Sequence, residues 1–193
     1  MVVGRWDRTP FGAFSDVMVE DRAGHRVLLA PDEGVADLLQ ATYRFDEVVI
    51  GDVTVVSARV SAATDRHDRS SEQWRLSAPG LQAELEVGPR TALGRLLSAV
   101  PRPLATSTGW LTLIDPAAAM IMKGVHTRGS VGPGRTEFYG AYDARSLERA
   151  RGRWRGTDLG TLAPVEPPVR FGFGSTPSAP TVTSLVTTIR TRV

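Results

Sequence analysis

The stretch Leu81-Gln82-Ala83-Glu84-Leu85-Glu86-Val87 decides the class of fold that we expect. Its apolar residues alternate strictly with glutamine and glutamates. Because successive side chains of a strand point to opposite faces of a sheet, this alternation predicts a strand with one buried face and one wet face. Such a strand requires a core on one side, so the pattern predicts a sheet that packs against other parts of the chain.

The residues around this stretch also favour strands. Residues 17–20 and 25–29 are apolar runs on either side of a four-residue connection that ends in Gly24, which indicates a hairpin. Residues 62–72 are mostly polar and charged without an apolar period, so we expect an exposed loop there. Further strands are predicted at 47–50, 53–60, 73–77, 136–142, 147–155 and 181–192, with residues 143–146 joining two of them.

Helical spacing marks two parts of the chain. Residues 32–41 carry apolar side chains at helical intervals, and the acidic residues at their start suit the positive end of a helix, so a short amphipathic helix is predicted. In the second part, apolar residues recur at helical spacing between Leu93 and Val100. Two more short helices are expected at 104–114 and 116–122, and a glycine-rich loop is expected at 124–135.

These elements predict a mainly β (α+β) fold. We expect a curved or closed antiparallel sheet or barrel with a helical insertion at about 91–122. Closure would remove unpaired strand edges, and the lack of a regular strand–helix alternation argues against a parallel sheet. A chain of 193 residues supports one sizeable core, so residues 1–193 are expected to form a single domain.

The composition limits the classes of function. A hydrophobic fraction of 41% argues against global disorder, and a formal net charge of only +2 argues against a nucleic-acid partner. The chain has no cysteine, which excludes disulfides and thiolate chemistry. The first residues do not resemble a signal peptide and the apolar runs are too short for a membrane span, so we expect a cytoplasmic protein without membrane contact. The oligomeric state stays open.

A glycine-rich stretch near residue 130 gathers side chains that could carry chemistry. Lys123 is the only lysine, and next to an apolar helix its amine could lose its proton and act as a nucleophile. The alternative is a lysine that simply complements the end of a helix, with Gly124 as the C-cap. The candidate catalytic residues are Lys123, His126 and Glu137, and the candidate ligand-binding residues in this region are Arg128, Arg135 and Tyr139.

Arginines at 149, 151, 153 and 155 follow a period of two. On a strand they would share one face, where Arg151 and Arg153 are candidates for binding an anion, while Trp154 faces the core. The alternative is a solvated strand face with acidic neighbours. His67 lies between two aspartates, but the spacing matches no known ligand pattern, so neither a metal site nor a cofactor is expected.

Two stretches resemble a family of small uncharacterised proteins from high-GC bacteria: residues 14–19 through 28–31, and residues 167–177. The chain also resembles acetoacetate decarboxylase-like β-barrels, which place a short helix between early strands and an aromatic strand, here 138–142, before a basic one. In that family a lysine forms a Schiff base with a keto acid and an arginine helps to position it. The resemblance implies that Lys123 is the counterpart of that lysine.

Three functions follow from these patterns as hypotheses. The first is binding of a small molecule in a barrel or sheet pocket, because the chain has strands and aromatic positions without a complete catalytic set. The second is a lysine-dependent enzyme that acts on a small carbonyl or keto-acid substrate through Lys123. The third is a protein or anion interaction module that uses the arginine strand.

Overall fold

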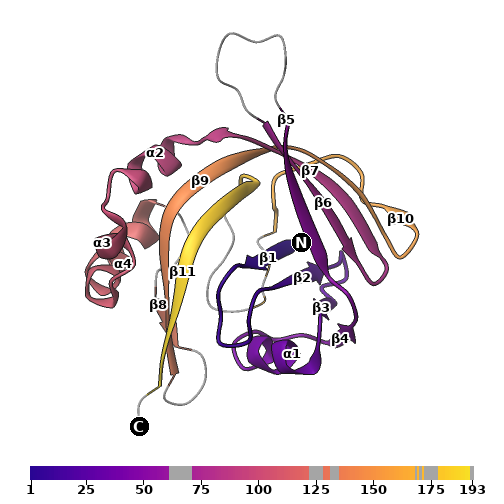
Figure 1. The fold of residues 1–193 in the computed structure, drawn as a ribbon, viewed down its shortest axis with the longest axis horizontal. Helices are drawn as coiled ribbons and strands as arrows, with labels where there is room; N and C mark the ends of the chain where they lie inside the picture. Colours follow the sequence, from indigo (N-terminus) through magenta and orange to yellow (C-terminus); the bar gives the residue numbers. More distant parts are fainter. Residues whose placement is uncertain are drawn as a thin grey trace. The chain divides into compact units, whose positions relative to one another are not determined.

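The computed structural model describes residues 1–60, 71–121, 128–130, 135–167, 169, 171 and 178–191. The fold is mainly β, as predicted, and contains two sheets (Figure 1). The chain divides into two compact units, Met1–Val87 with Glu148–Leu162, and Gly88–Leu147 with Ala163–Val193. Strands β7 and β9 contribute residues to both units. The expectation of one domain stays a prediction, and each unit is described by itself below.

The first unit contains a four-stranded sheet with the order β1-β2-β3-β4. The predicted hairpin at 17–20 and 25–29 is confirmed, since β2 and β3 pair antiparallel with Val17 opposite Leu29. The expectation that the strands pair antiparallel throughout was wrong, because β3 and β4 pair parallel. The first strand was not predicted. The strands are β1 (Val2–Trp6), β2 (Phe14–Glu20), β3 (Arg26–Ala30) and β4 (Glu47–Ile50).

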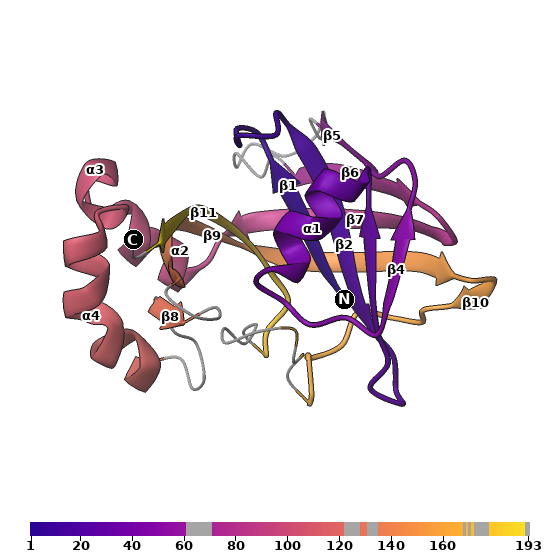
Figure 2. The same cartoon turned by 90° about the horizontal axis from the view of Figure 1, so that it is seen from below.

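Helix α1 (Glu33–Gln40) connects the two parallel strands and confirms the helix predicted at 32–41. Asp32 is the N-cap, and its Oδ1 accepts a hydrogen bond of 2.8 Å from the backbone N–H of Val35. The helix buries Val35, Ala36 and Leu39 and lies against the sheet of β1–β4, as both ribbon views show (Figures 1 and 2). A helix between two parallel strands is the crossover that parallel pairing requires.

The second sheet has the strand order β10-β9-β7-β6-β5, and β8 and β11 also pair with β9. In the first unit, the alternation of Leu81–Val87 is confirmed: the four apolar side chains are buried, while Gln82 and Glu84 are exposed. Residues 71 and 72, predicted as loop, already belong to β6. The strands of this unit are β5 (Thr54–Val60), β6 (Ser71–Ala78), β7 (Leu81–Arg90), the end of β9 (Arg135–Trp154) and β10 (Thr157–Asp158).

The core of the first unit lies between its two sheets. Val17 and Leu29 come from the four-stranded sheet, and Leu76 and Leu81 from the other. Trp154 packs against this cluster from β9, so its predicted place in the core is confirmed. Two sheets with one apolar face each therefore bury those faces against one another.

The second unit combines part of β9 with helices. Residues 136–142 and 147–155 were predicted as two strands, but β9 is continuous from Arg135 to Trp154. Its register with β11 shifts so that Tyr142 has no partner, which marks a β-bulge. The other elements are α2 (Ala92–Ser98), α3 (Arg102–Ala105), α4 (Thr108–Ile121), β8 (Arg128–Ser130) and β11 (Thr181–Thr191).

The helical insertion is present, but its inner boundaries differ from the prediction. Residues 104–114 and 116–122 were expected as two helices separated at Pro116, whereas Pro116 lies inside α4. The alanines that follow it favour a helix strongly enough for the helix to continue. The loop expected at 124–135 was partly wrong, because Arg128–Ser130 form β8 and Arg135 begins β9.

The expected closure of the sheet is not observed. In the described residues the second sheet runs from β10 at one end to β5 at the other, and the first sheet has β1 and β4 as its edges. None of the helices in the part of the chain that the structure describes is long and apolar enough to cross a membrane.

Candidate functional site

The sequence-predicted residues Glu137 and Tyr139 lie together in the second unit. They are two residues apart on β9, so their side chains share one face of the strand. Thr187 of β11 is the register partner of Tyr139 and therefore lies on the same face. We call Glu137, Tyr139 and Thr187 the Glu137 face.

The polar groups of the Glu137 face are shielded from solvent. Glu137 is only 3% exposed, and the Tyr139 hydroxyl donates a hydrogen bond of 2.8 Å to its Oε2. The Thr187 Oγ1 is also buried and has no hydrogen-bond partner among the residues that the structure describes. Buried hydroxyls are normally paired, so a threonine in this condition requires an explanation.

Apolar side chains border these polar groups. Leu185 and Ile189 flank Thr187 at positions i−2 and i+2 of β11, and they are 39% and 37% exposed. Their spacing places them on the same face as Thr187. A few buried polar groups with apolar neighbours are the composition typical of small-molecule sites.

The helices of this unit contact the other face of β9. A Cβ placed on Gly140 would lie 2.9 Å from the Ala105 carbonyl oxygen, so α3 approaches the strand where a side chain would not fit. Gly140 alternates with Tyr139 along β9, and its face is therefore opposite to the Glu137 face. Helix α3 thus packs against β9 on the face opposite to the Glu137 face.

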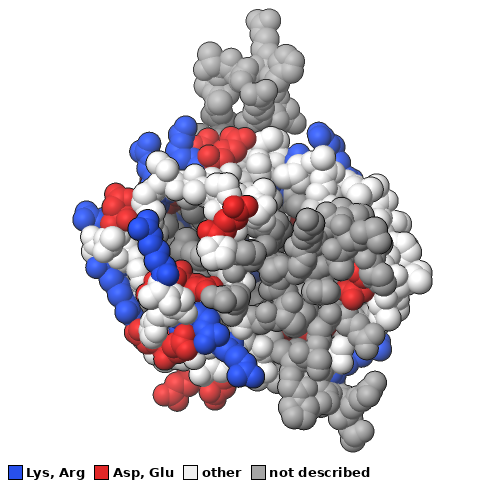
Figure 3. All heavy atoms as spheres, turned by 180° about the vertical axis from the view of Figure 1, so that it is seen from behind, with Lys and Arg blue, Asp and Glu red and all other residues white. Residues whose placement is uncertain are grey.

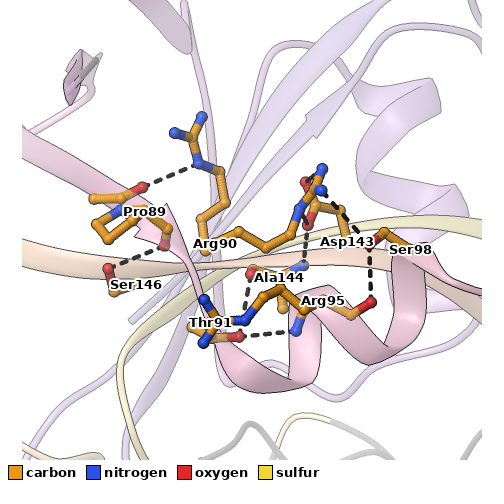
Figure 4. A network of polar contacts seen from close by, with 11 residues as sticks. Pro89, Arg90, Thr91, Arg95, Ser98, Asp143, Ala144 and Ser146 are labelled. Atoms are coloured by element: carbon orange, nitrogen blue, oxygen red, sulfur yellow. Dashed lines mark hydrogen bonds and ion pairs between the residues drawn. The ribbon is translucent and has the colours of Figure 1, made fainter. Parts of the chain in front are cut away.

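A polar network attaches α2 to β9 next to the bulge (Figure 4). Arg90 donates to both carboxylate oxygens of Asp143, at 2.7 and 3.2 Å, and this hydrogen bonding raises the pKa of Arg90. The Thr91 N–H and hydroxyl both donate to the Ala144 carbonyl, at 2.9 and 3.1 Å. Thr91 is also the N-cap of α2, accepting from the Gly94 N–H. These contacts position the helix against β9.

The arginine row lies on the exposed face of β9 in the first unit. Arg149 is 3.2 Å from Glu86 of β7, and Arg153 donates one hydrogen bond to the Gly156 carbonyl. Arg151 and Arg153 are exposed. Figure 3 shows acidic side chains interspersed among the basic ones on the face it presents. The pairing of Arg149 with Glu86 favours the alternative of a solvated strand face with acidic neighbours, and binding of an anion by Arg151 and Arg153 stays a prediction.

Arg155 was wrongly predicted to continue the row. It lies in the turn between β9 and β10 with φ 48°, followed by Gly156 with φ 81°. Consecutive positive φ values are typical of a two-residue hairpin turn that follows the twist of the strands. Arg155 instead donates a hydrogen bond to Glu47 and covers the Trp154 ring, with 4.7 Å between the guanidinium carbon and the ring centroid.

Other predicted site residues cannot be placed. Lys123 and His126 lie outside the described residues, as does His67. Arg128 and Arg135 have described backbones in β8 and at the start of β9, but their side chains lie outside the description. The Schiff-base hypothesis, which depends on Lys123, therefore stays a prediction.

The sequence analysis missed two unusual side chains. Thr187 gave no signal, because it is one of several threonines in a Thr/Val-rich strand. Asp16 of β2 is fully buried, and that burial raises its pKa to about 6. Asp16 gave no signal in the sequence either, because its burial depends on Gly4 and Trp6 of β1 lying over it.

Comparison of the chain with protein-family models, curated proteins and solved structures finds no match. The resemblances described above therefore stay expectations, and the function is argued from the residues alone.

Proposed function

We propose that the protein binds a small polar molecule on the Glu137 face of its second unit. The buried Thr187 hydroxyl without a hydrogen-bond partner, directly opposite Tyr139, is the observation that carries this proposal. An unpaired buried hydroxyl costs about 1–3 kcal/mol, and valine would fill nearly the same volume without that cost. A ligand that hydrogen-bonds to the hydroxyl would remove the penalty.

The Thr187 hydroxyl decides which ligand groups are favoured. The Tyr139 hydroxyl already donates to Glu137, whereas the Thr187 hydroxyl has no hydrogen-bond partner among the described residues. A hydroxyl can both donate and accept hydrogen bonds. We therefore infer a small molecule that carries amine, amide or hydroxyl groups. A short apolar group on this molecule would pack against the side chains of Leu185 and Ile189.

A thermal-shift screen tests the proposal. Small amines, amides, polyols and carboxylates are each added to the wild type, to Thr187→Val and to Thr183→Val, an exposed threonine of the same strand that serves as the matched control. An amine, amide or polyol should raise the melting temperature of the wild type and of T183V, but not of T187V.

The same screen can refute the proposal. If no compound stabilises the wild type, or if T187V responds as the wild type does, the Glu137 face is not the binding site. Without ligand, T187V should be more stable than the wild type by about 1 kcal/mol, because the unpaired hydroxyl is gone. That measurement shows that a lost response of T187V comes from lost binding and not from a damaged fold.

A further inference from the structure

Asp16 is a fully buried carboxyl in the first unit, far along the chain from the Glu137 face. Its Oδ1 accepts a hydrogen bond of 2.7 Å from the Trp6 indole N–H. Its Oδ2 is buried and has no hydrogen-bond partner in the described part of the chain. The residue is 0% exposed, so in the folded state water does not reach the carboxyl. A carboxylate in this position would hold its charge with a single donor, which is unfavourable.

Strand β1 supplies both the space and the donor for this carboxyl. Gly4 is the register partner of Asp16, and a Cβ on Gly4 would lie 2.1 Å from Oδ1 and 2.7 Å from the Trp6 Nε1. The carboxyl therefore occupies the place that a side chain at position 4 would take. Trp6 closes the site from the same strand, with its ring 5.7 Å from that of Phe14.

β1 is an edge strand of its sheet. In the part of the chain that the structure describes, its strand partner is β2. Three of its side chains add contacts: Val3 packs against the core, Arg5 donates a hydrogen bond of 3.1 Å to Ser57, and Trp6 donates to Asp16. Edge strands open more readily than central ones, because fewer hydrogen bonds and contacts must break.

The neighbouring elements bury apolar groups. Asp16 directly precedes Val17, which pairs with Leu29 of β3, and the buried side of α1 consists of Val35, Ala36 and Leu39. The acidic residues at 32, 33 and 37, in α1 and at its N-cap, are exposed. Arg5 of β1 donates a hydrogen bond to Ser57. Burial is the main cause of the raised pKa of Asp16, and the Trp6 hydrogen bond opposes it.

We propose that Asp16 is a proton-sensitive latch for strand β1. With its proton, the carboxyl stays under Trp6 and β1 stays paired in the sheet. Without the proton, the buried charge favours opening of β1, which lets water solvate the carboxylate.

The size of the effect follows from linkage. The closed state holds the Asp16 proton with a pKa of about 6, whereas an opened strand returns the group to its ordinary value of 3.8. Between these two values the closed state is protonated and the open state is not, so opening becomes about tenfold easier per pH unit. The total change is about a hundredfold, and it levels off above pH 6, where both states are ionised.

Hydrogen exchange followed by mass spectrometry tests the latch. Protection factors, corrected for the intrinsic rate at each pH, are measured from pH 4 to 7 on the whole chain for the wild type, Asp16→Asn and Asp46→Asn. Asp46 is the matched control, since it is a half-exposed carboxylate of the same unit that is paired with Arg26. Amides of 2–6 should be less protected than amides of 27–30 in the central strand β3, because β1 opens without unfolding of the whole sheet. In the wild type and D46N, amides of 2–6 should lose about a hundredfold of protection between pH 4 and 6. D16N should show no such loss.

Three results would overturn the proposal: constant protection of β1 over this range, the same loss in D16N, or protection of 2–6 equal to that of 27–30, which would show that β1 opens only when the whole sheet unfolds. If D16N does not fold, Trp6→Phe serves instead. It removes the donor that opposes the raised pKa, so the loss of β1 protection should extend to higher pH than in the wild type. An unchanged pH profile in W6F would also contradict the latch.

Discussion

Helix α2 lies so close to β9 that the glycine at position 94 is required. A Cβ on Gly94 would lie 2.0 Å from the Ala144 carbonyl oxygen and 2.9 Å from its carbonyl carbon. Both are backbone atoms, which a rotamer change cannot move. Gly94→Ala must therefore push the helix away from the strand by more than an ångström to reach ordinary van der Waals contact.

The expected loss of stability can be worked from these contacts. Moving the helix strains or breaks the two hydrogen bonds from Thr91 to the Ala144 carbonyl, each of about 1 kcal/mol. Overpacking itself adds about 1–3 kcal/mol. Alanine recovers about 1 kcal/mol, because it favours a helix more than glycine does. We expect G94A to lower the free energy of unfolding by about 2–4 kcal/mol.

Gly109→Ala is the matched control. Gly109 is also helical, in α4, and an added Cβ would meet no atom within 4 Å. The same substitution there should raise the free energy of unfolding by about 1 kcal/mol, through helix propensity alone. Urea unfolding followed by circular dichroism measures both variants. If G94A is as stable as the wild type or G109A, the close approach of α2 to β9 does not limit stability and the reasoning is refuted.

Three further predictions concern polar side chains of the two units. The raised pKa of Asp16 means that the folded state holds this proton more tightly than the unfolded chain, so the free energy of unfolding should fall by about 3 kcal/mol as pH rises from about 4 to 6. The difference between the wild type and D16N in urea isolates this slope, and parallel curves would contradict it. Asp32→Ala should lower stability by about 1 kcal/mol through loss of the N-cap, whereas Glu33→Ala, which removes no cap, should lower it less; equal losses would argue against the cap. A double-mutant cycle on Arg90 and Asp143, both replaced by alanine, should give a coupling of about 0.5–1 kcal/mol that decreases with salt, and a coupling of zero would show that the pair only fills space.

The parts of the fold that could be predicted are those whose signal is local. The alternation in Leu81–Val87 and the hairpin of β2 and β3 depend on neighbouring residues, and so does α1 with its cap at Asp32. The parallel pairing of β3 with β4 could not be predicted, because it depends on where the chain returns after α1. The continuity of β9 depends on the bulge at Tyr142, which absorbs one residue without ending the strand.

The candidate site also combines features that the sequence predicts with features that depend on the tertiary structure. The period of two along β9 was sufficient to place Glu137 and Tyr139 on one face, and both were candidates from the sequence. Their hydrogen bond depends on rotamers, and the presence of Thr187 beside them depends on the register with β11. Arg155 was misplaced because a turn with positive φ interrupts the period of two, and a sequence pattern does not record backbone φ.

The sequence of Leu81–Val87 was sufficient to determine which of its side chains lie on the same face and which face must be buried. The reason is that the period of two is a local property of a strand. Only the tertiary structure decided what covers each face. Asp16 is buried because β1 and Trp6 close over it, and the Thr187 hydroxyl is unpaired because of its neighbours on β9 and β11. Burial and pairing of a polar group are properties of the atoms around it, and those atoms come from residues far apart in the chain.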